Sequence, residues 1–258
     1  MRITTTTTPP TTAQVDVRRS ADRFDTTTSW LDSHHSFSFG HHYDPANTHH
    51  GLLLVNNDDT VAAGAGFETH PHRDVEIVTW VLQGSLVHQD STGHTGVIHP
   101  GLAQRMSAGR GILHSEKNDS WRVQGDPHAD PVHFVQMWVV PDTDATTPGY
   151  EQREVDHELL SGGLVTVASG RASDEAAIRI ASSDAALHVA RLQPGRSVEL
   201  PQAPWLHLFV ARGAVTLEGA GALAEGDAVR FTATGGQRVT ATEPAEVLVW
   251  EMHSRLHH

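Results

Sequence analysis

Short apolar stretches recur along the chain from Gly51 onward, and turn-forming residues separate them. The stretches are rich in Val, Ile, Leu and Trp, whereas Gly, Pro, Asn and Asp fill the intervals. This rhythm is typical of β-strands, and helical periodicity is weak throughout. In the first half it predicts strands at 52–55, 75–82, 86–89, 96–98, 112–115 and 132–140.

A segment rich in Pro, Asp, Thr and Gly interrupts the rhythm at 141–150, and we predict that it is a linker. The rhythm then resumes, with predicted strands at 164–168, 187–192, 197–200, 206–211, 214–217, 228–231, 237–242 and 247–252. We therefore expect an N-terminal domain at 15–140 and a C-terminal domain at 151–258.

The two halves share a strand–turn–strand pattern. Val81-Leu82-Gln83-Gly84-Ser85-Leu86 in the first corresponds to Val210-Ala211-Arg212-Gly213-Ala214-Val215 in the second. Because closed or stacked sheets hide the edges of such short strands, we predict an all-β protein built from two tandem antiparallel β-barrels. The Thr- and Pro-rich residues 1–14 are polar and of low complexity, and we expect them to be disordered.

Composition excludes several kinds of chemistry. The chain contains no Cys, which excludes disulfides, thiolate nucleophiles and iron–sulfur clusters, so a bound metal must use nitrogen and oxygen ligands. The formal net charge is -13, so we do not expect the basic surface by which proteins bind nucleic acids or anionic membranes. There is no apolar run of about 18 residues and no signal-peptide pattern, so we expect a cytoplasmic protein. The net charge does not exclude binding to a specific protein partner.

Histidine is abundant, with 20 residues, so a single His-x-His triplet carries little information. His70 and His72 flank a proline, and the side-chain period of two in a strand places both imidazoles on one face. The proline removes an amide donor and stiffens the pair. His114 and Glu116 have the same spacing. On neighbouring strands, the two pairs would bring three imidazoles and one carboxylate to one point.

Such a donor set suits one divalent ion of Fe, Ni, Co, Cu, Mn or Zn and leaves coordination positions for water or substrate. The alternative is that these are exposed residues of a histidine-rich chain. The matched spacing favours the metal site, and so does the glycine-rich turn before each pair, at Gly64-Ala65-Gly66 and Gly109-Arg110-Gly111.

The other histidines have simpler interpretations. Those in loop-like sequence are expected at the surface, namely His34, His35, His41, His42, His49 and His50. His88 and His133 lie on predicted strands, where they belong either to the core or to a group that orients a metal ligand.

Three segments of the first half combine into a recognisable signature. An aromatic segment contains Ser36-Phe37-Ser38-Phe39 and Tyr43-Asp44-Pro45, and a long strand reads Val132-His133-Phe134-Val135-Gln136-Met137-Trp138. The segment between them contains Gly66, Phe67, His70, Pro71, His72, Glu76, Gly84, His88, Asp90, Ser91, Gly96, Pro100, Gly101, Met106, Ser107, Ala108, Gly109, Gly111, Ile112, His114, Ser115, Glu116 and Asn118. Together they resemble the pirin family. Matching residues are frequent over 29–150, whereas in the second half only the predicted order of strands and turns resembles the family.

This resemblance implies a bicupin, with two barrels packed face to face and metal in the N-terminal barrel alone. It implies iron(II) as the metal and ligands at His70, His72, His114 and Glu116. Glu76 takes the place of the carboxylate ligand in the general cupin motif. Pirin-like proteins use the later Glu, so we expect Glu76 beside the site or in a structural role. In the second half, Trp205-Leu206-His207 offers one histidine where the first half has a pair, which argues against a second metal.

For several members the resemblance also implies quercetin 2,3-dioxygenase activity, with a flavonol and O2 as substrates. Glu116 would then be the base that takes the proton of the flavonol 3-hydroxyl, and Phe67, Met106 and Trp138 would line an apolar pocket. The alternative is a metal- and redox-dependent regulator that binds a transcription factor or a metabolic enzyme. An isomerase or sugar-modifying cupin is a more distant alternative. We expect a monomer.

Overall fold

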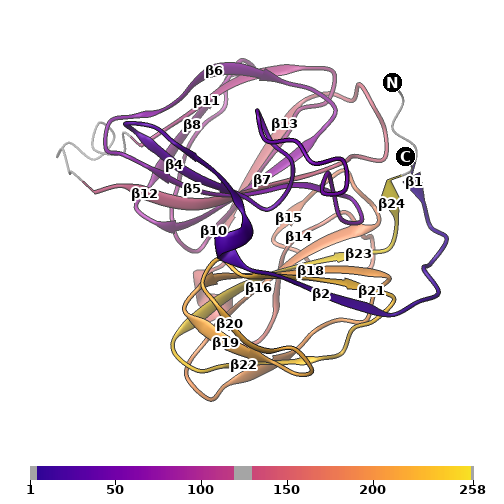
Figure 1. The fold of residues 1–258 in the computed structure, drawn as a ribbon. Coiled ribbons are helices and arrows are strands. Elements are labelled where there is room, and N and C mark those ends of the chain that lie inside the picture. The colour runs from indigo at the N-terminus through magenta and orange to yellow at the C-terminus, as the bar shows by residue number, and fades with distance from the viewer. Residues whose placement is uncertain (1–4, 119–129, 257–258) are drawn as a thin grey trace.

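Strands form almost all of the regular structure in the computed structural model, which describes residues 5–118 and 130–256. Two β-barrels are stacked on one another, and each has a large sheet facing the other barrel and a small sheet on the outside (Figure 1). The prediction of an all-β protein with two tandem, mainly antiparallel barrels is confirmed.

The N-terminal barrel contains a seven-stranded and a four-stranded sheet. Across the large sheet the order is β13 (Gly149–Glu154), β10 (Leu102–Ser107), β7 (Glu76–Gln83), β12 (Val132–Val139), β5 (Leu53–Val61), β4 (Leu31–His35) and β3 (Phe24–Thr27). Across the small sheet it is β6 (Gly66–His72), β11 (Ile112–Lys117), β8 (Leu86–Asp90) and β9 (Thr95–Ile98).

The C-terminal barrel repeats this arrangement. Its large sheet has the order β15 (Ile178–Arg179), β14 (Val165–Ser169), β16 (Ala185–Leu192), β23 (Ala245–Met252), β18 (Trp205–Arg212), β21 (Ala228–Thr232) and β2 (Gln14–Arg18). Its small sheet has β17 (Ser197–Glu199), β22 (Arg238–Ala241), β19 (Ala214–Leu217) and β20 (Gly221–Ala224). The remaining elements are β1 (Thr5–Thr6), β24 (Arg255–Leu256), η1 (Ser20–Asp22) and α2 (Asp156–Leu159).

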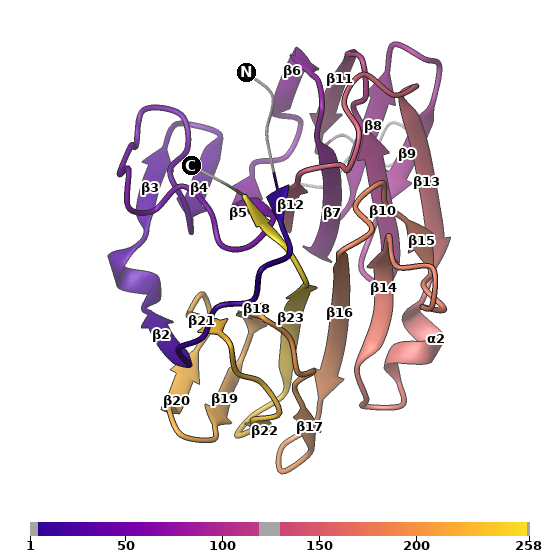
Figure 2. The ribbon, with the colours of Figure 1, turned by 90° about the vertical axis from the view of Figure 1, so that its right-hand side faces the viewer.

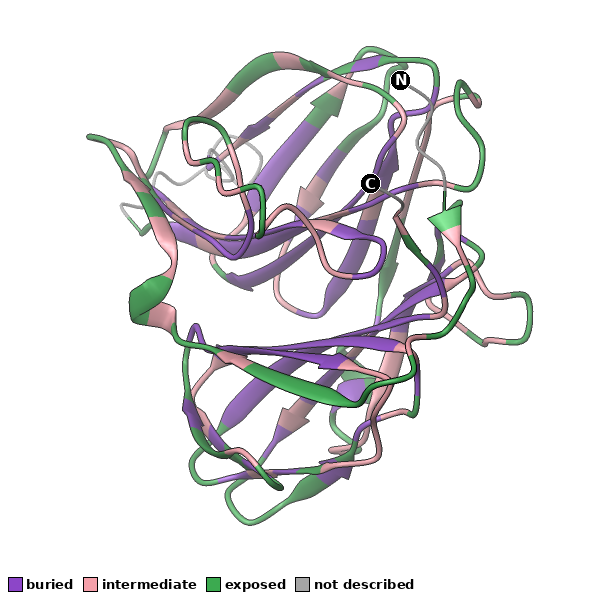
Figure 3. Ribbon diagram, turned by 45° about the vertical axis from the view of Figure 1, so that its right-hand side comes forward, coloured by how far each residue is buried: buried purple, intermediate pink, exposed green. Residues whose placement is uncertain are grey.

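The two large sheets share one apolar core. It includes Phe37, Trp80, Val135 and Met137 from the first barrel and Phe209, Leu248, Trp250 and Met252 from the second. The central strands are therefore buried on both faces, toward the other barrel and toward their own barrel's interior (Figure 3). This is why 76–82 and 245–252 are mostly apolar in sequence and do not alternate between apolar and polar residues.

The barrels exchange short segments. Strand β2 lies in the first residues of the chain, yet it pairs with β21 of the C-terminal barrel (Figure 2). Strand β13 overlaps the end of the predicted linker and the start of the predicted C-terminal domain, yet it pairs with β10 of the N-terminal barrel. The sheets therefore do not divide at residues 15 and 151 as we predicted, because local sequence does not tell which sheet edge a short strand will join.

The predicted disorder of residues 1–14 does not hold for the described part of that segment. Thr5 and Thr6 pair with Leu256 and Arg255, and Gln14 belongs to β2. The pairing gives this polar segment backbone hydrogen-bond partners that its composition does not reveal. Residues 1–4, at the start of the predicted tail, and 257–258, at the end of the C-terminal domain, lie outside the described residues.

The interiors of the two barrels differ. Apolar side chains fill the C-terminal barrel, among them Leu206, Leu208, Val215, Phe231 and Val249. The N-terminal barrel instead contains a cavity of about 760 Å³ lined by aromatic and polar side chains. No helix in the described ranges is long and apolar enough to cross a membrane.

Candidate metal centre

Strands β6 and β11 bring the two predicted ligand pairs together. They are antiparallel neighbours, with His114 opposite His70 and Ile112 opposite His72. The register shifts between His114 and Glu116, so Glu116 lies opposite Phe67. This irregularity changes the direction of the strand between the two predicted ligands of β11.

Gly66 permits the close approach of these strands. A Cβ atom on this residue would overlap the Glu116 carbonyl oxygen and lie 2.5 Å from Lys117 Cα. The glycine-rich turn that the sequence places before the first histidine pair thus has a steric role beside the second pair.

Three imidazoles converge inside the N-terminal barrel. His114 Nε2 lies 3.1 Å from His70 Nε2. The ring centroid of His72 lies 4.8 Å from that of His70 and 4.9 Å from that of His114. Nitrogen atoms of all three residues lie within 4.8 Å of one another, a spacing that could hold a metal ion.

The hydrogen bonds of the imidazoles leave ring nitrogens available to bind a metal ion. His70 Nδ1 donates to the Glu68 carbonyl oxygen at 2.7 Å, which leaves the Nε2 lone pair available. His72 Nε2 is buried and has no hydrogen-bond partner among the described residues. A buried nitrogen without a partner is costly, and a metal ion would satisfy it.

The electrostatics also suit metal binding. Burial, together with the neighbouring His114 and His70, lowers the pKa of His72 to about 4. Burial likewise lowers the pKa of His114 to about 3, together with His70 and His88. Both imidazoles are therefore neutral at pH 7, which is the form that binds metals.

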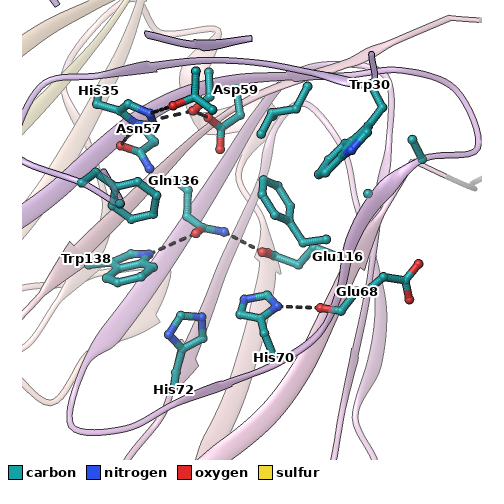
Figure 4. A pocket seen from close by; sticks show the side chains of 18 of the residues that line it. Trp30, His35, Asn57, Asp59, Glu68, His70, His72, Glu116, Gln136 and Trp138 are labelled. Atoms are coloured by element: carbon teal, nitrogen blue, oxygen red, sulfur yellow. Dashed lines mark hydrogen bonds between the residues drawn. The ribbon is translucent and has the colours of Figure 1, made fainter. Parts of the chain in front are cut away.

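Glu116 is buried and held by polar neighbours. Gln136 Nε2 donates to Glu116 Oε2 at 2.7 Å, and Trp138 Nε1 donates to Gln136 Oε1 at 3.0 Å (Figure 4). Thr79 Oγ1 lies 3.4 Å from Glu116 Oε1. The carboxylate falls in a second group of ligand atoms, with His114 and His88, within 4.8 Å of one another. His114 thus links the two groups.

His88 lies behind His114 in a buried polar chain. Its Nδ1 is 3.5 Å from His114 Nδ1, and its Nε2 is 3.3 Å from Asp90 Oδ2. Asp90 Oδ2 in turn lies 3.2 Å from Nδ1 of the exposed His94. Tyr150 packs against His88 with a centroid distance of 4.8 Å. Of the two interpretations of His88, the structure supports that of a group orienting a ligand.

The cavity lies directly against the histidines. Trp30, Phe39, Phe67 and Trp138 form apolar parts of its wall, while His70, His72 and Glu116 lie on one side of it. His35, Asn57 and Asp59 lie on the opposite side (Figure 4).

The polar side of the cavity contains an unusual carboxyl group. Burial raises the pKa of Asp59 to about 7, although a hydrogen bond from the Ser33 hydroxyl opposes this. His35 Nδ1 lies 2.9 Å from Asn57 Oδ1. Sequence analysis missed Asp59 and Asn57, and the available signal was a run of polar residues, 56–60, inside an otherwise buried strand.

Two of the three residues that we predicted in the pocket line the cavity, and Glu76 has the structural role that was one of its two expected roles. Phe67 and Trp138 line the cavity, whereas Glu76 and Met106 do not. Met106 packs in a separate apolar cluster. Glu76 begins β7, in the sheet that faces the other barrel, so its carboxylate accepts hydrogen bonds from Ser107 Oγ at 2.8 Å and Ala181 N at 3.0 Å. Its role is therefore structural, between the barrels.

Three histidines expected in exposed loops lie elsewhere, and the first of them, His34, is on β4. His35 is on β4, is only 2% exposed and lines the cavity. His50 lies 3.0 Å from the Phe231 carbonyl oxygen, across the junction of the barrels. His207 of the C-terminal barrel is buried, and neither ring nitrogen has a hydrogen-bond partner among the described residues.

Comparisons with known proteins agree with this architecture. Residues 15–139 match the family model described as Pirin, and 166–252 match that of the quercetinase C-terminal cupin domain. A Mycobacterium tuberculosis protein with the provisional name quercetin 2,3-dioxygenase is 64% identical over 245 residues, covering 95% of this chain and 98% of its own. The chain belongs to the pirin family.

Solved pirin structures have the same fold. The bacterial pirin YhhW from Escherichia coli, in complex with nickel(II), superposes with a TM-score of 0.81 at 32% identity, covering 93% of this chain and 99% of that chain. An Escherichia coli protein named quercetin 2,3-dioxygenase is 44% identical over 140 residues, covering 54% of this chain and 58% of its own. The pirin resemblance predicted from the sequence is thus confirmed.

Proposed function

We propose that this pirin-family chain binds one divalent metal ion through His70, His72, His114 and Glu116 and uses it to open flavonols such as quercetin with O2. The observation that carries the proposal is the meeting of three imidazoles and a buried carboxylate at the wall of a largely aromatic cavity. Iron(II) is the proposed metal, with Ni, Co, Cu, Mn and Zn as alternatives. A related bacterial pirin was solved in complex with nickel(II), which supports metal binding by a protein of this family.

The cavity suits a flat, hydroxylated aromatic molecule. Its volume of about 760 Å³ lies within the usual range of small-molecule sites, about 300–1,000 Å³. Trp30, Phe67 and Trp138 offer aromatic surfaces for such a ring system. On the opposite side of the cavity from His70 and His72, the side chains of His35 and Asp59 can form hydrogen bonds with hydroxyl groups of the substrate.

Glu116 is the proposed base. When bound, the metal would supply Lewis acidity to the flavonol 3-oxygen and redox chemistry toward O2. Gln136 donates to Oε2 of Glu116 at 2.7 Å, whereas Thr79 Oγ1 donates to Oε1 at the longer distance of 3.4 Å. Oε1 is therefore the less tightly held oxygen and is the proposed acceptor of the 3-hydroxyl proton. The aromatic walls keep the substrate oriented and displace water from the site.

Two measurements on the purified full chain test the proposal. Elemental analysis should find about one metal ion per chain, and a His70→Ala/His72→Ala variant that still holds it would refute the site. The iron(II)-loaded protein should consume O2 with quercetin, His114→Ala should abolish this, and the exposed control His157→Ala should retain it. Metal binding without turnover on any flavonol would contradict the enzyme and favour a metal-dependent regulator with a protein partner.

A further inference from the structure

A second, smaller cavity of about 180 Å³ lies at the junction of the barrels. Four arginines line it, Arg18, Arg19, Arg23 and Arg230. The first three come from the segment that crosses from β2 to the N-terminal barrel, and Arg230 comes from β21 (Figure 2). The cavity therefore gathers positive charge from both sides of the junction.

Three of these arginines have carboxylate partners. The nitrogen–oxygen distances are 2.7 Å for Arg18 to Asp16, 2.7 Å for Arg19 to Asp227 and 3.0 Å for Arg23 to Asp58. Asp16 and the exposed Asp22 also line the cavity. Asp16 forms its ion pair with Arg18. Within residues 5–118 and 130–256, neither Asp16 nor Asp22 forms an ion pair with Arg230.

Arg230 is a buried cation whose hydrogen-bond partners, among the described residues, are neutral groups. It is 7% exposed, and its Nη2 donates to the Ser36 carbonyl oxygen at 2.8 Å and to Asn47 Oδ1 at 2.7 Å. The Phe37 ring lies 4.3 Å from its guanidinium carbon. Burial lowers the pKa of Arg230 to about 10, helped by Arg18 and opposed by Asp16, so the group is still charged at pH 7. A buried charge without a counter-ion is costly.

Two guanidinium donors in this cavity lack acceptors. Arg23 Nε and Arg230 Nε are both buried without a hydrogen-bond partner in the described part of the chain, and both residues line the cavity. A buried N–H donor of a charged group is costly when it has no hydrogen-bond partner. A negatively charged acceptor would relieve this cost, which indicates an anion as its ligand.

We propose that this cavity binds a small oxyanion, such as inorganic phosphate or a carboxylate, between Arg23 and Arg230. The planar guanidinium presents paired N–H groups that match two oxygens of either anion. The cavity has less than a quarter of the volume of the aromatic one, so it suits a small anion rather than a flavonol.

The anion would act as a clamp between the barrels. Arg230 belongs to the C-terminal sheet, whereas Ser36, Asn47 and Arg23 lie in the N-terminal part of the chain. His35 lines both this cavity and the aromatic one, so the bound anion would lie just behind the polar side of the proposed substrate site.

Calorimetric titration and thermal unfolding of the full chain test this, with inorganic phosphate and acetate added separately at constant ionic strength. At least one anion should bind saturably at about one site per chain. It should raise Tm by about 5 °C at a hundredfold excess over Kd. Arg230→Met should abolish both effects, Arg18→Gln should weaken binding, and the exposed control Arg196→Gln should change neither.

No saturable response to either anion, or an unchanged response in Arg230→Met, would overturn the proposal. Should Arg230→Met fail to fold, Arg230→Lys keeps the charge and loses the planar fork, and it should bind the anion at least about tenfold more weakly. Equal binding by Arg230→Lys would count against the site. Response to phosphate alone or to acetate alone would identify which oxyanion the cavity takes.

Discussion

At the scale of single residues, the functions of the histidines depend on burial rather than on number. His70, His72 and His114 meet inside a barrel, whereas His94 is exposed at the end of a polar chain. The same residue type is a proposed metal ligand in one environment and a surface group in another. The buried imidazoles also make stability depend on pH.

His50 provides a prediction of this kind. Burial, together with the nearby Arg230, lowers its pKa to about 4, whereas the unfolded chain has the ordinary value of about 6.5. The unfolded state therefore binds more protons between these values, and stability falls as the pH falls below about 6.5. Between pH 7 and pH 5, His50 should contribute a loss of about 1–2 kcal/mol in the free energy of unfolding.

Denaturant unfolding of the chain and of His50→Gln at both pH values measures this contribution. The variant should lose less stability on acidification than the unmodified chain. Equal losses would show that His50 titrates normally in the folded protein.

Gln136 provides a second prediction at this scale. Its amide donates to Glu116 and accepts from Trp138, so it fixes the proposed carboxylate ligand. Gln136→Leu should weaken metal binding about 10- to 100-fold, as is usual when a group that orients a metal ligand is lost. Competition with a chelator measures the affinity, with the exposed Gln89→Leu as control. An unchanged affinity would mean that Glu116 does not need this support.

At the scale of elements, the pairing of β6 with β11 builds the site. The strands place one histidine pair opposite the other, and the shift in register places Glu116 beside the cavity. A change that separates the two strands should therefore reduce metal binding more than it disturbs the C-terminal barrel.

Gly66→Ala makes that change. The added methyl group would overlap the Glu116 carbonyl, so β6 has to move away from β11. We expect a loss of about 2–4 kcal/mol in stability and of most of the metal affinity. Gly163→Ala is the matched control, since a Cβ there meets only Ser161 Oγ at 3.6 Å. Similar stability and metal content in the two variants would contradict this account of the strand pair.

At the scale of the whole molecule, the barrels are tied together by a shared core and by exchanged strands. Trp80 Nε1 donates to Glu246 Oε1 at 2.5 Å, and Trp250 Nε1 lies 3.2 Å from Met137 Sδ. Neither barrel can separate without exposing this core and breaking the β2–β21 and β10–β13 pairs.

Unfolding should therefore be a single cooperative transition. Scanning calorimetry should give a calorimetric enthalpy close to the van't Hoff enthalpy, although the chain contains two barrels. Two resolved transitions, one for each barrel, would contradict the coupling.

The sequence by itself determined the all-β class, the two barrels and the pirin family. These depend on local patterns, namely apolar stretches between turn residues and histidine pairs at a spacing of two. Local spacing places side chains on one face of a strand, so it also predicted which residues of β6 and β11 would meet. Phe67 and Trp138 at the cavity follow from the family resemblance.

Only the tertiary structure decided which distant residues complete each site. Gln136 beside Glu116, Asp59 across the cavity and Arg230 between the barrels come from strands whose register no local pattern specifies. The same holds for the exchange of β2 and β13 and for Glu76, which joins the barrels instead of the cavity. Long-range pairing and burial fix these positions, because the free energy that selects them arises only when both partners are in place.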